Sequence, residues 1–237
     1  MILNTRIMRP AIAMIELIFA IVIMGIILMS APMLISTAAQ SGYVAIQQEA
    51  INEAASQVNL IMGYHWDEND VNDIQMNPIL RVTNGHADLA EDGSSGRRQG
   101  TPEESYRSFI RSDGEDDLNA SSSLGIDGTE TIEDDVDDFD GNTSLVLIQS
   151  STTDYIEDET TININTDINY ISDSVGGGYN QSSIIFNPFT ASTGTTNIKS
   201  ITIKLTSSGP EELAKEIELL GFSCNIGEYK LEEKDVN

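Results

Sequence analysis

The densest group of side chains suited to binding a metal ion lies between Thr131 and Asn142, in the run TIEDDVDDFDGN. Calcium binds about six to eight oxygen atoms, which carboxylates and carbonyls supply. The run does not fit an EF-hand loop, because no frame follows the Asp-x-Asp-x-Asp-Gly order with a glutamate at the twelfth position. A calcium site is one hypothesis, and a solvated acidic loop anchored by Val136 and Phe139 is the favoured one. The calcium ligands would be Asp135, Asp137, Asp138 and Asp140.

The chain has few histidine and cysteine side chains that could take part in catalysis or bind a transition metal. His65 stands beside Asp67 and Asp70, but His86 is the only other histidine, and the spacing does not match a transition-metal site. The sequence contains no Gly-rich phosphate loop, nucleophile elbow or zinc-protease motif. Its many carboxylate pairs lie in polar loops, which lack the apolar surroundings that raise a carboxyl pKa. The sequence therefore predicts that the protein is not an enzyme and has no cofactor, with calcium as the one alternative.

A second chemical feature is a single carboxylate inside an apolar run. Between Ile12 and Ile35 the only ionisable side chain is Glu16. About 20 consecutive apolar residues suffice for a helix to cross a bilayer. A carboxylate in such a run costs about 2.5 to 3.5 kcal/mol on insertion scales, so it requires a partner, and the natural partner is a positive charge. The run predicts a membrane-spanning helix with one polar position near its start.

The residues around Glu16 resemble a known processing signal. The segment AIAMIELI, which begins at Ala11 and is followed by Gly25 and Pro32, resembles the class III signal of type IV pilins and type II secretion pseudopilins. In that family a membrane peptidase cuts just before the apolar run and methylates the new N-terminus. The resemblance implies cleavage between Ala11 and Ile12, methylation of Ile12, and Glu16 as the fifth residue of the mature chain.

The resemblance also implies what the protein assembles with. The new N-terminal amine of one subunit would neutralise Glu16 of its neighbour inside the membrane or filament. The expected partners are the prepilin peptidase, other pilin or pseudopilin subunits, an inner-membrane assembly platform and membrane lipid. The chain departs from the family at the cut, where Ala11 and Ile12 replace the usual Gly and Phe. The run DVDDFDG, from Asp135 to Gly141, resembles a segment of minor pilins of the mannose-sensitive haemagglutinin type.

Charge sets the orientation and narrows the class of function. Arg6 and Arg9 precede the apolar run and acidic residues dominate the chain after it, so the positive-inside rule places the leader in the cytoplasm. This predicts a single-pass inner-membrane protein with an extracytoplasmic head. A net charge of −26 argues against nucleic-acid binding, which needs clustered Lys and Arg. Cys224 is the only cysteine, which excludes an intrachain disulfide, and it is expected to be a small buried residue.

The chain is expected to divide into four parts. Residues 1–11 form the leader, 12–35 the membrane or filament helix, 36–63 an amphipathic continuation and 64–237 the head. The continuation has apolar residues at three- and four-residue steps, which is typical of one face of a helix. They are Tyr43, Ile46, Ala50, Ala54, Val58 and Ile61. Pro32 removes a backbone donor and is expected to kink or locally melt the helix.

The head is expected to combine strands with an acidic insertion. From about 84 to 141 the sequence is rich in Gly, Ser, Asp and Glu, which predicts loops and a short helix around 103–111. Alternating apolar and polar residues then predict antiparallel strands, although the last segment also fits a short helix. The strands are expected at 145–148, 160–171, 197–205 and 217–224. The predicted class is α+β, with an antiparallel sheet packed on the apolar stripe of the long helix.

These features together predict a prepilin-like structural subunit that is assembled into a type IV pilus or a type II secretion pseudopilus. A minor pilin or pseudopilin is favoured over a major pilin, since every repeat of a filament would have to accommodate the acidic insertion. An uncleaved signal anchor over residues 12–34 would look similar. The alternative function is therefore a membrane-anchored extracytoplasmic binding protein, such as a calcium-dependent adhesin, that never polymerises. The sequence leaves open adhesion, secretion, DNA uptake and motility.

Overall fold

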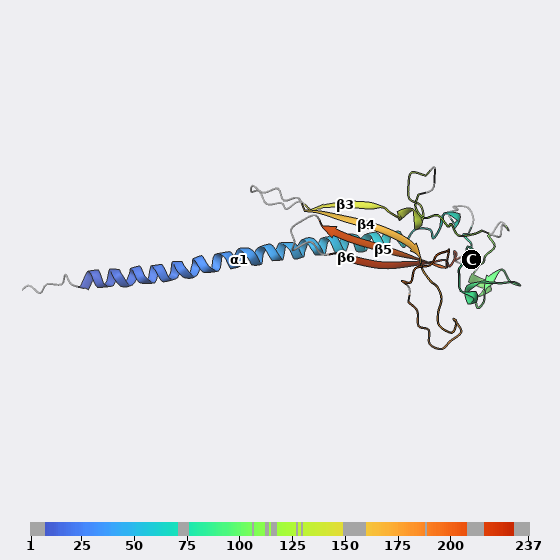
Figure 1. The fold of residues 1–237 in the computed structure, drawn as a ribbon, viewed down its shortest axis with the longest axis horizontal. Helices are drawn as coiled ribbons and strands as arrows, with labels where there is room; N and C mark the ends of the chain where they lie inside the picture. Colours follow the sequence, from blue (N-terminus) through green and yellow to red (C-terminus); the bar gives the residue numbers. More distant parts are fainter. Residues whose placement is uncertain are drawn as a thin grey trace, which may run out of the picture. The chain divides into compact units, whose positions relative to one another are not determined.

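The computed structural model describes residues 8–70, 76–105, 107–111, 114, 118–126, 128, 130–148, 160–187, 189–207 and 216–229. The chain divides into two compact units, Met1–Glu49 and Ala50–Asn237. One helix, α1 (Met8–Ile61), contributes to both units (Figure 1). Residues 1–7 of the predicted leader lie outside the described residues. Because α1 begins at Met8, the predicted cleavage point after Ala11 lies near the start of this helix.

In the first unit, α1 exposes apolar side chains around its whole circumference. Phe19 is 63% exposed, Ile23 55% and Leu28 72%. By length and composition this helix is able to cross a membrane. The hydroxyls of Ser30 and Thr37 donate to carbonyls of the same helix, at 3.0 and 2.9 Å. Hydroxyls bonded in this way leave no unmet donor on the apolar surface.

Pro32 lies inside α1, and the helix runs through it without interruption. The expected local melting at this residue is therefore wrong. Proline lacks the N–H group that would bond one turn earlier, but only that one rung of the ladder is lost. The neighbouring Met29 and Met33 are exposed, so no packed side chain competes with the proline ring for space. Pro32 therefore does not break α1.

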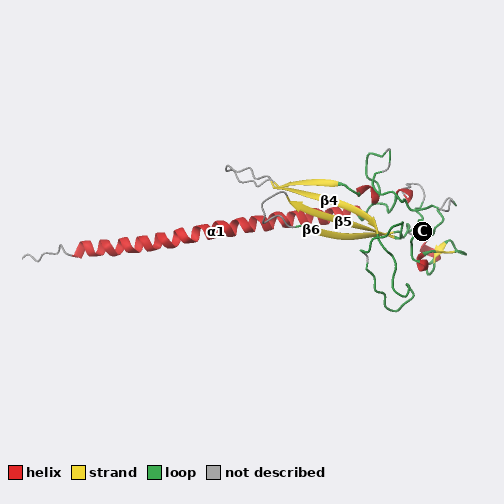
Figure 2. Ribbon diagram, in the orientation of Figure 1, coloured by secondary structure: helices red, strands yellow, loops and turns green. Residues whose placement is uncertain are grey.

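A four-stranded antiparallel sheet is the framework of the second unit (Figure 2). The predicted strands are confirmed, with shifts of a few residues at some ends, and the last segment is a strand. Cys224 ends this last strand as a free cysteine that is half-buried rather than fully buried. In sheet order the strands are β3 (Thr143–Ile148), β4 (Thr160–Tyr170), β5 (Ile198–Ser207) and β6 (Ile217–Cys224).

Strand β4 places alternate residues in the core, whereas β5 is buried on both faces from Ile198 to Ile203. Ile164 of β4 is fully buried while the next residue, Asn165, is exposed. On β5, Ile201 and Ile203 are fully buried on one face of the strand. The same face also carries Lys199, because side chains two residues apart on a strand point the same way. A charged residue thus occupies a position that the pattern reserves for an apolar one.

The end of α1 packs on this sheet through the stripe that the sequence predicts. Gln57 donates its side-chain N–H to the Ser144 hydroxyl of β3 at 2.8 Å. Gly221 of β6 lies against Val58, because a Cβ atom at this glycine would come within 2.8 Å of a Val58 methyl. The stripe residues that are fully buried are Ala50, Ala54 and Ile61. One long apolar helix and an antiparallel sheet make this an α+β protein.

The chain between the helix and the sheet is mostly loop. It contains a small hairpin of β1 (Glu91–Asp92) and β2 (Arg97–Arg98). The predicted helix at 103–111 is wrong, because the described part of this segment forms only the 3-10 turn Glu103–Ser105. Phe109 is buried instead, and its N–H donates to the Gly96 carbonyl at 2.8 Å. This contact ties the segment to the hairpin and outweighs the local helix signal.

Candidate functional site

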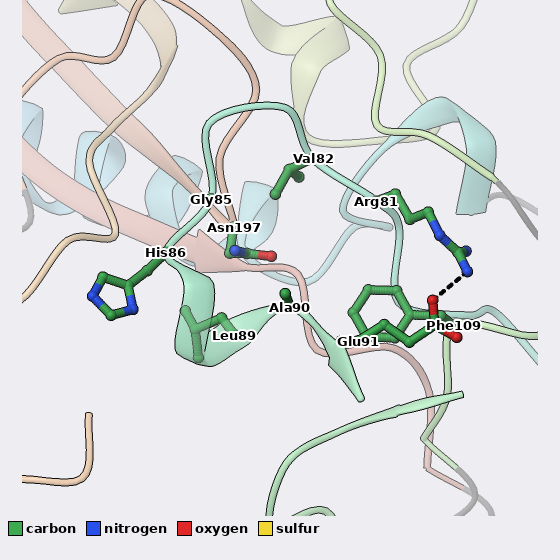
Figure 3. A pocket seen from close by; sticks show the side chains of 9 residues that line it. All are labelled: Arg81, Val82, Gly85, His86, Leu89, Ala90, Glu91, Phe109 and Asn197. Atoms are coloured by element: carbon green, nitrogen blue, oxygen red, sulfur yellow. Dashed lines mark hydrogen bonds and ion pairs between the residues drawn. The ribbon is translucent and has the colours of Figure 1, made fainter. Parts of the chain in front are cut away.

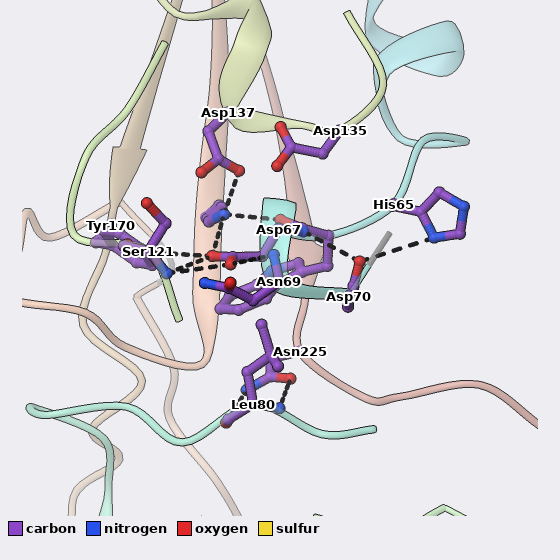
Figure 4. A network of polar contacts seen from close by, with 12 residues as sticks. His65, Asp67, Asn69, Asp70, Leu80, Ser121, Asp135, Asp137, Tyr170 and Asn225 are labelled. Carbon is purple, nitrogen blue, oxygen red and sulfur yellow. Dashed lines mark hydrogen bonds and ion pairs between the residues drawn. The ribbon is translucent and has the colours of Figure 1, made fainter. Parts of the chain in front are cut away.

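The most unusual chemistry of the second unit lies around Lys199. Its side chain is completely buried, on the core face of β5. The ammonium group donates to the Trp66 carbonyl at 2.7 Å, to Asp67 Oδ2 at 3.0 Å and to the Asp137 carboxylate. Figure 4 shows Asp67 and Asp137 converging on this point from separate loops. An ammonium has three N–H donors, so all three are satisfied.

Two aromatic rings enclose the ammonium of Lys199. Its Nζ atom lies 4.4 Å from the ring centroid of Trp66 and 5.3 Å from that of Tyr170. The two rings meet edge to face, with centroids 6.2 Å apart. Rings attract a cation through the electron density of their faces, and more strongly where water is excluded. Trp66 is buried and donates its indole N–H to the Ser223 carbonyl at 3.4 Å.

Asp67 accepts hydrogen bonds from several donors besides Lys199. Its oxygens accept the Ser121 N–H at 3.1 and 2.9 Å and the Asn69 N–H at 3.2 Å (Figure 4). The Tyr170 hydroxyl lies 3.2 Å from Oδ2, and burial raises the pKa of this phenol above its usual value. Both oxygens of Asp67 therefore have hydrogen-bond donors inside the head.

The four predicted calcium ligands lie close in the sequence but use their carboxylates differently. Asp135 and Asp137 are buried near Lys199 (Figure 4). The carboxylate of Asp138 accepts two backbone N–H groups of its own turn, at 3.0 and 3.4 Å. Asp140 Oδ1 accepts a backbone N–H of β4 at 2.9 Å. The structure therefore brings two of the four to the lysine and sets the other two on backbone donors.

The centre of the acidic run, from Asp135 to Asp138, is buried, so the prediction of a solvated loop is wrong for this part, whereas both ends of the run are exposed. Val136 is fully buried, which confirms its anchoring role, and its N–H donates to the His65 carbonyl at 2.9 Å. Carboxylates enter a core when a positive charge and hydrogen bonds compensate their lost hydration, and Lys199 supplies that charge. Three carboxylates of the run are at most 5% exposed: Asp135, Asp137 and Asp138.

Burial raises the pKa of three carboxyl groups in this cluster. Burial, with a smaller contribution from the negative charge of Asp137, raises the pKa of Asp135 to about 8. Burial raises the pKa of Asp70 to about 7 and that of Asp137 to about 6, although the charge of Lys199 opposes the rise at Asp137. The expectation that these loops lack the apolar surroundings to raise a carboxyl pKa is therefore wrong here. The pKa values of these three carboxyl groups therefore lie closer to neutral pH than that of an ordinary aspartate.

A second group of carboxylates converges elsewhere in the same unit. One oxygen from each of Glu68, Glu130 and Asp134 lies within 4.8 Å of the other two, and all three residues are half-buried. Hard cations such as calcium take carboxylate oxygens as ligands. None of the four predicted calcium ligands belongs to this group. The arrangement nevertheless offers a cation three ligands from the loops that precede the sheet.

A cavity of about 290 Å³ lies beside the small hairpin (Figure 3). The Arg81 guanidinium pairs with Glu91 at 2.5 Å and lies 5.5 Å from the ring centroid of Phe109. These two charges neutralise each other at the wall of the cavity. The lining residues are Arg81, Val82, Gly85, His86, Leu89, Ala90, Glu91, Phe109 and Asn197.

Comparisons with protein-family models, with curated proteins and with solved structures found no match. The residues themselves therefore carry the functional argument. Sequence reasoning missed Lys199, although a signal for it exists in the strand pattern. Lys199 is in phase with the apolar positions Ile201 and Ile203, whereas Lys204 is out of phase. A lysine in phase with a buried face indicates a buried cation that needs carboxylates from elsewhere in the chain.

Proposed function

We propose that this protein is a prepilin-like subunit, a minor pilin or pseudopilin, of an extracytoplasmic filament. The observation that supports this most directly is the exposed apolar surface of α1 from Met14 to Ile35, in which Glu16 is the only ionisable residue. Water solvates such a surface poorly, so it requires lipid or other helices around it. A bundle of packed subunit helices provides that cover once a subunit leaves the bilayer.

In the proposed pathway, the prepilin peptidase cuts between Ala11 and Ile12 and methylates the new amine of Ile12. The amine remains a cation after methylation, and it pairs with Glu16 of a neighbouring subunit. An unpaired carboxylate is costly in an apolar environment, so this pair favours one register between the subunits. The inner-membrane assembly platform then transfers the helix from lipid to the filament.

We place the precursor in the inner membrane, with one span and an extracytoplasmic head. The positive charges of Arg6 and Arg9 before the span support this orientation. The head becomes part of the surface of a pilus or pseudopilus after assembly. Its net negative charge suits an extracytoplasmic surface that stays soluble, since like-charged heads repel one another.

The first test is the intact mass and N-terminal sequence of the membrane-extracted protein, produced with and without the prepilin peptidase. We expect a chain that begins at methylated Ile12 when the peptidase is present, and the full chain when it is absent. Retention of Met1 to Ala11 in both samples would contradict the proposal and would indicate a signal anchor.

A second test separates assembly from membrane insertion. Glu16→Ala removes the only carboxylate of the apolar run, and we expect normal insertion but loss of the subunit from sheared filaments. Glu53→Ala is the matched control, because Glu53 is an exposed glutamate farther along the same helix. If both variants enter filaments as well as the wild type does, the proposed pairing of Glu16 is wrong.

A second candidate function is a membrane-anchored, calcium-dependent binding protein that does not polymerise. The convergence of Glu68, Glu130 and Asp134 favours it. Calcium that binds only the folded state raises the unfolding free energy by RT ln(1 + [L]/Kd). Thermal unfolding of the full-length protein in detergent, at rising calcium concentration, measures this shift. The candidate requires a shift in the wild type that Glu130→Gln reduces, and equal curves with and without calcium would exclude it.

A further inference from the structure

The surroundings of Lys199 and Asp137 favour a reaction between the two side chains as well as an ion pair. Both side chains are withdrawn from water, and the ammonium nitrogen contacts the Asp137 carboxylate directly. The rings of Trp66 and Tyr170 enclose the contact. Two groups held in contact react as if each were present at about 10⁵ to 10⁸ M, and the exclusion of water opposes the reverse hydrolysis.

We propose that Lys199 and Asp137 condense to an isopeptide bond inside the folded head. A bond forms between Nζ of Lys199 and Cγ of Asp137, one carbon–oxygen bond of the Asp137 carboxyl group breaks, and one water molecule leaves. Carbon and nitrogen keep their oxidation states, so the step needs no oxidant, reductant or cofactor. The inference does not depend on the proposed filament function, because both residues lie in the second unit.

The neighbouring carboxyl groups provide the proton transfers that this step requires. Asp67 Oδ2 lies 3.0 Å from Nζ and takes one proton from the ammonium, which leaves an amine with a free electron pair. Asp135 lies beside Asp137 (Figure 4), where it donates a proton to the departing oxygen. Counted from the ion pair of Lys199 and Asp137, two of the three ammonium protons leave in the water molecule, one of them after it has neutralised the Asp137 carboxylate, and the third stays on the amide nitrogen.

The contacts distinguish Asp137 from Asp67 as the carbon that is attacked. The Asp67 carboxylate also accepts the backbone N–H groups of Ser121 and Asn69, which hold it in place as a hydrogen-bond acceptor. Asp137 instead contacts the lysine and the acid Asp135. Burial raises the pKa of Asp137 to about 6, so its neutral, more electrophilic form is accessible near neutral pH.

The resulting amide would join the acidic run to β5 covalently. It replaces a buried ion pair by a neutral group, and Asp67 keeps its other hydrogen-bond donors. A cross-link between residues 62 positions apart also reduces the conformational freedom of the unfolded chain. A denaturant that opens the head would therefore leave this connection in place.

The test is the mass of the full-length, detergent-extracted protein after denaturation. We expect a chain that is lighter than its sequence requires by one water molecule. Asp-Gly steps such as Asp92-Gly93 also lose water when they cyclise, so the loss must be located. After digestion, the peptide with Lys199 should be branched to the peptide with Asp137, and trypsin should not cut after Lys199.

Variants distinguish the bond from other losses of water. Lys199→Met and Asp137→Ala should have the full mass of their sequences, whereas Lys204→Met, on the same strand but partly exposed, should keep the loss. Asp135→Asn should slow the loss after refolding, with circular dichroism as the check of its fold. An unbranched Lys199 peptide from the folded wild type overturns the proposal without any variant, and unchanged kinetics in Asp135→Asn overturn the role of Asp135.

Discussion

The two ends of α1 belong to regions that differ in which side chains they expose to water and which they bury. From Ala13 to Gly42, the helix exposes apolar side chains such as Phe19 and Leu28 and buries none of them. In the second unit, Lys199 and Asp67 are charged and completely buried. The first region has apolar surface without cover, whereas the second compensates its buried charges within itself. This difference indicates that the first region needs partners to cover its apolar surface, whereas the reactive groups of the second region lie inside its own core.

Removing the buried ammonium tests this contrast most strongly. Lys199→Met keeps the length of the side chain but removes the ammonium and, with it, the proposed bond to Asp137, so the buried carboxyl groups lose both their counter-charge and the cross-link. We expect the unfolding free energy to fall by about 3 to 5 kcal/mol, because an uncompensated buried charge is costly. Urea denaturation measures this loss. Lys204→Met should stay within about 0.5 kcal/mol of the wild type, and equal stability of the two variants would show that the head does not depend on its buried pair.

A charge placed in the apolar region tests the other side of the contrast. Ile23→Asp puts a carboxylate on the exposed apolar surface of α1, at a cost of about 2.5 to 3.5 kcal/mol on insertion scales. We expect a smaller carbonate-resistant membrane fraction, with Ile23→Leu behaving as the wild type does. An unchanged membrane fraction for Ile23→Asp would mean that lipid does not cover this surface.

The pH dependence of stability sharpens the description of the buried cluster. The pKa values of Asp135 and Asp70, two carboxyl groups that stay free when Asp137 is joined to Lys199, are raised to about 8 and 7, against about 3.9 for an unfolded aspartate. The folded state thus binds more protons than the unfolded state between about pH 4 and 8. The unfolding free energy should fall as pH rises through this window, by about 1.4 kcal/mol per pH unit for each retained proton.

Urea denaturation at several pH values checks the sign of this dependence. Asp135→Asn imitates the protonated carboxyl group and should reduce the slope at the alkaline end of the window. Asp67, Asp138 and Lys199 also face the cluster, so the slope reports on the group as a whole. Stability that rises between pH 5 and 8 would contradict the burial of protonated carboxyl groups.

The smallest expected effect compares two glutamines of the same helix. Gln57→Ala removes the hydrogen bond to Ser144 and should lower the unfolding free energy by about 0.5 to 1.5 kcal/mol. Gln40→Ala, at an exposed position of the first unit, should leave the unfolding of the head unchanged. Equal effects of the two variants would show that the stability of the head does not distinguish the two parts of α1.

The framework could be predicted from the sequence because its signals are local. The stripe from Ala50 to Ile61 and the alternation in β4 and β5 repeat with the period of the backbone, so each short window contains the information. The helix signal at 103–111 is equally local, but the tertiary contact of Phe109 with Gly96 outweighs it. Local periodicity thus predicts an element only where no distant contact competes.

The strand pattern indicates that Lys199 is buried, but it does not predict which carboxylates surround it. The sequence around Asp67 and Asp137 is polar and predicts loops, and the burial of both residues depends on Lys199 of the distant strand β5. The pKa of a carboxyl group is set by burial and neighbouring charges, which are tertiary properties. The polar composition of these loops therefore led to the wrong prediction of a solvated environment for their carboxylates, although the acidic residues themselves were recognised from the sequence.

The distance along the chain between Lys199 and its partners also bears on when the head becomes complete. Asp67 lies 132 residues before the lysine and Asp137 lies 62 residues before it. Contacts across such long loops form late, because the loop must close before they can stabilise anything. The chain is synthesised from its N-terminus, so both aspartates emerge before Lys199. Until β5 is made, the carboxylates stay hydrated and the loops open to proteases, so a truncated head is degraded more readily than a finished one.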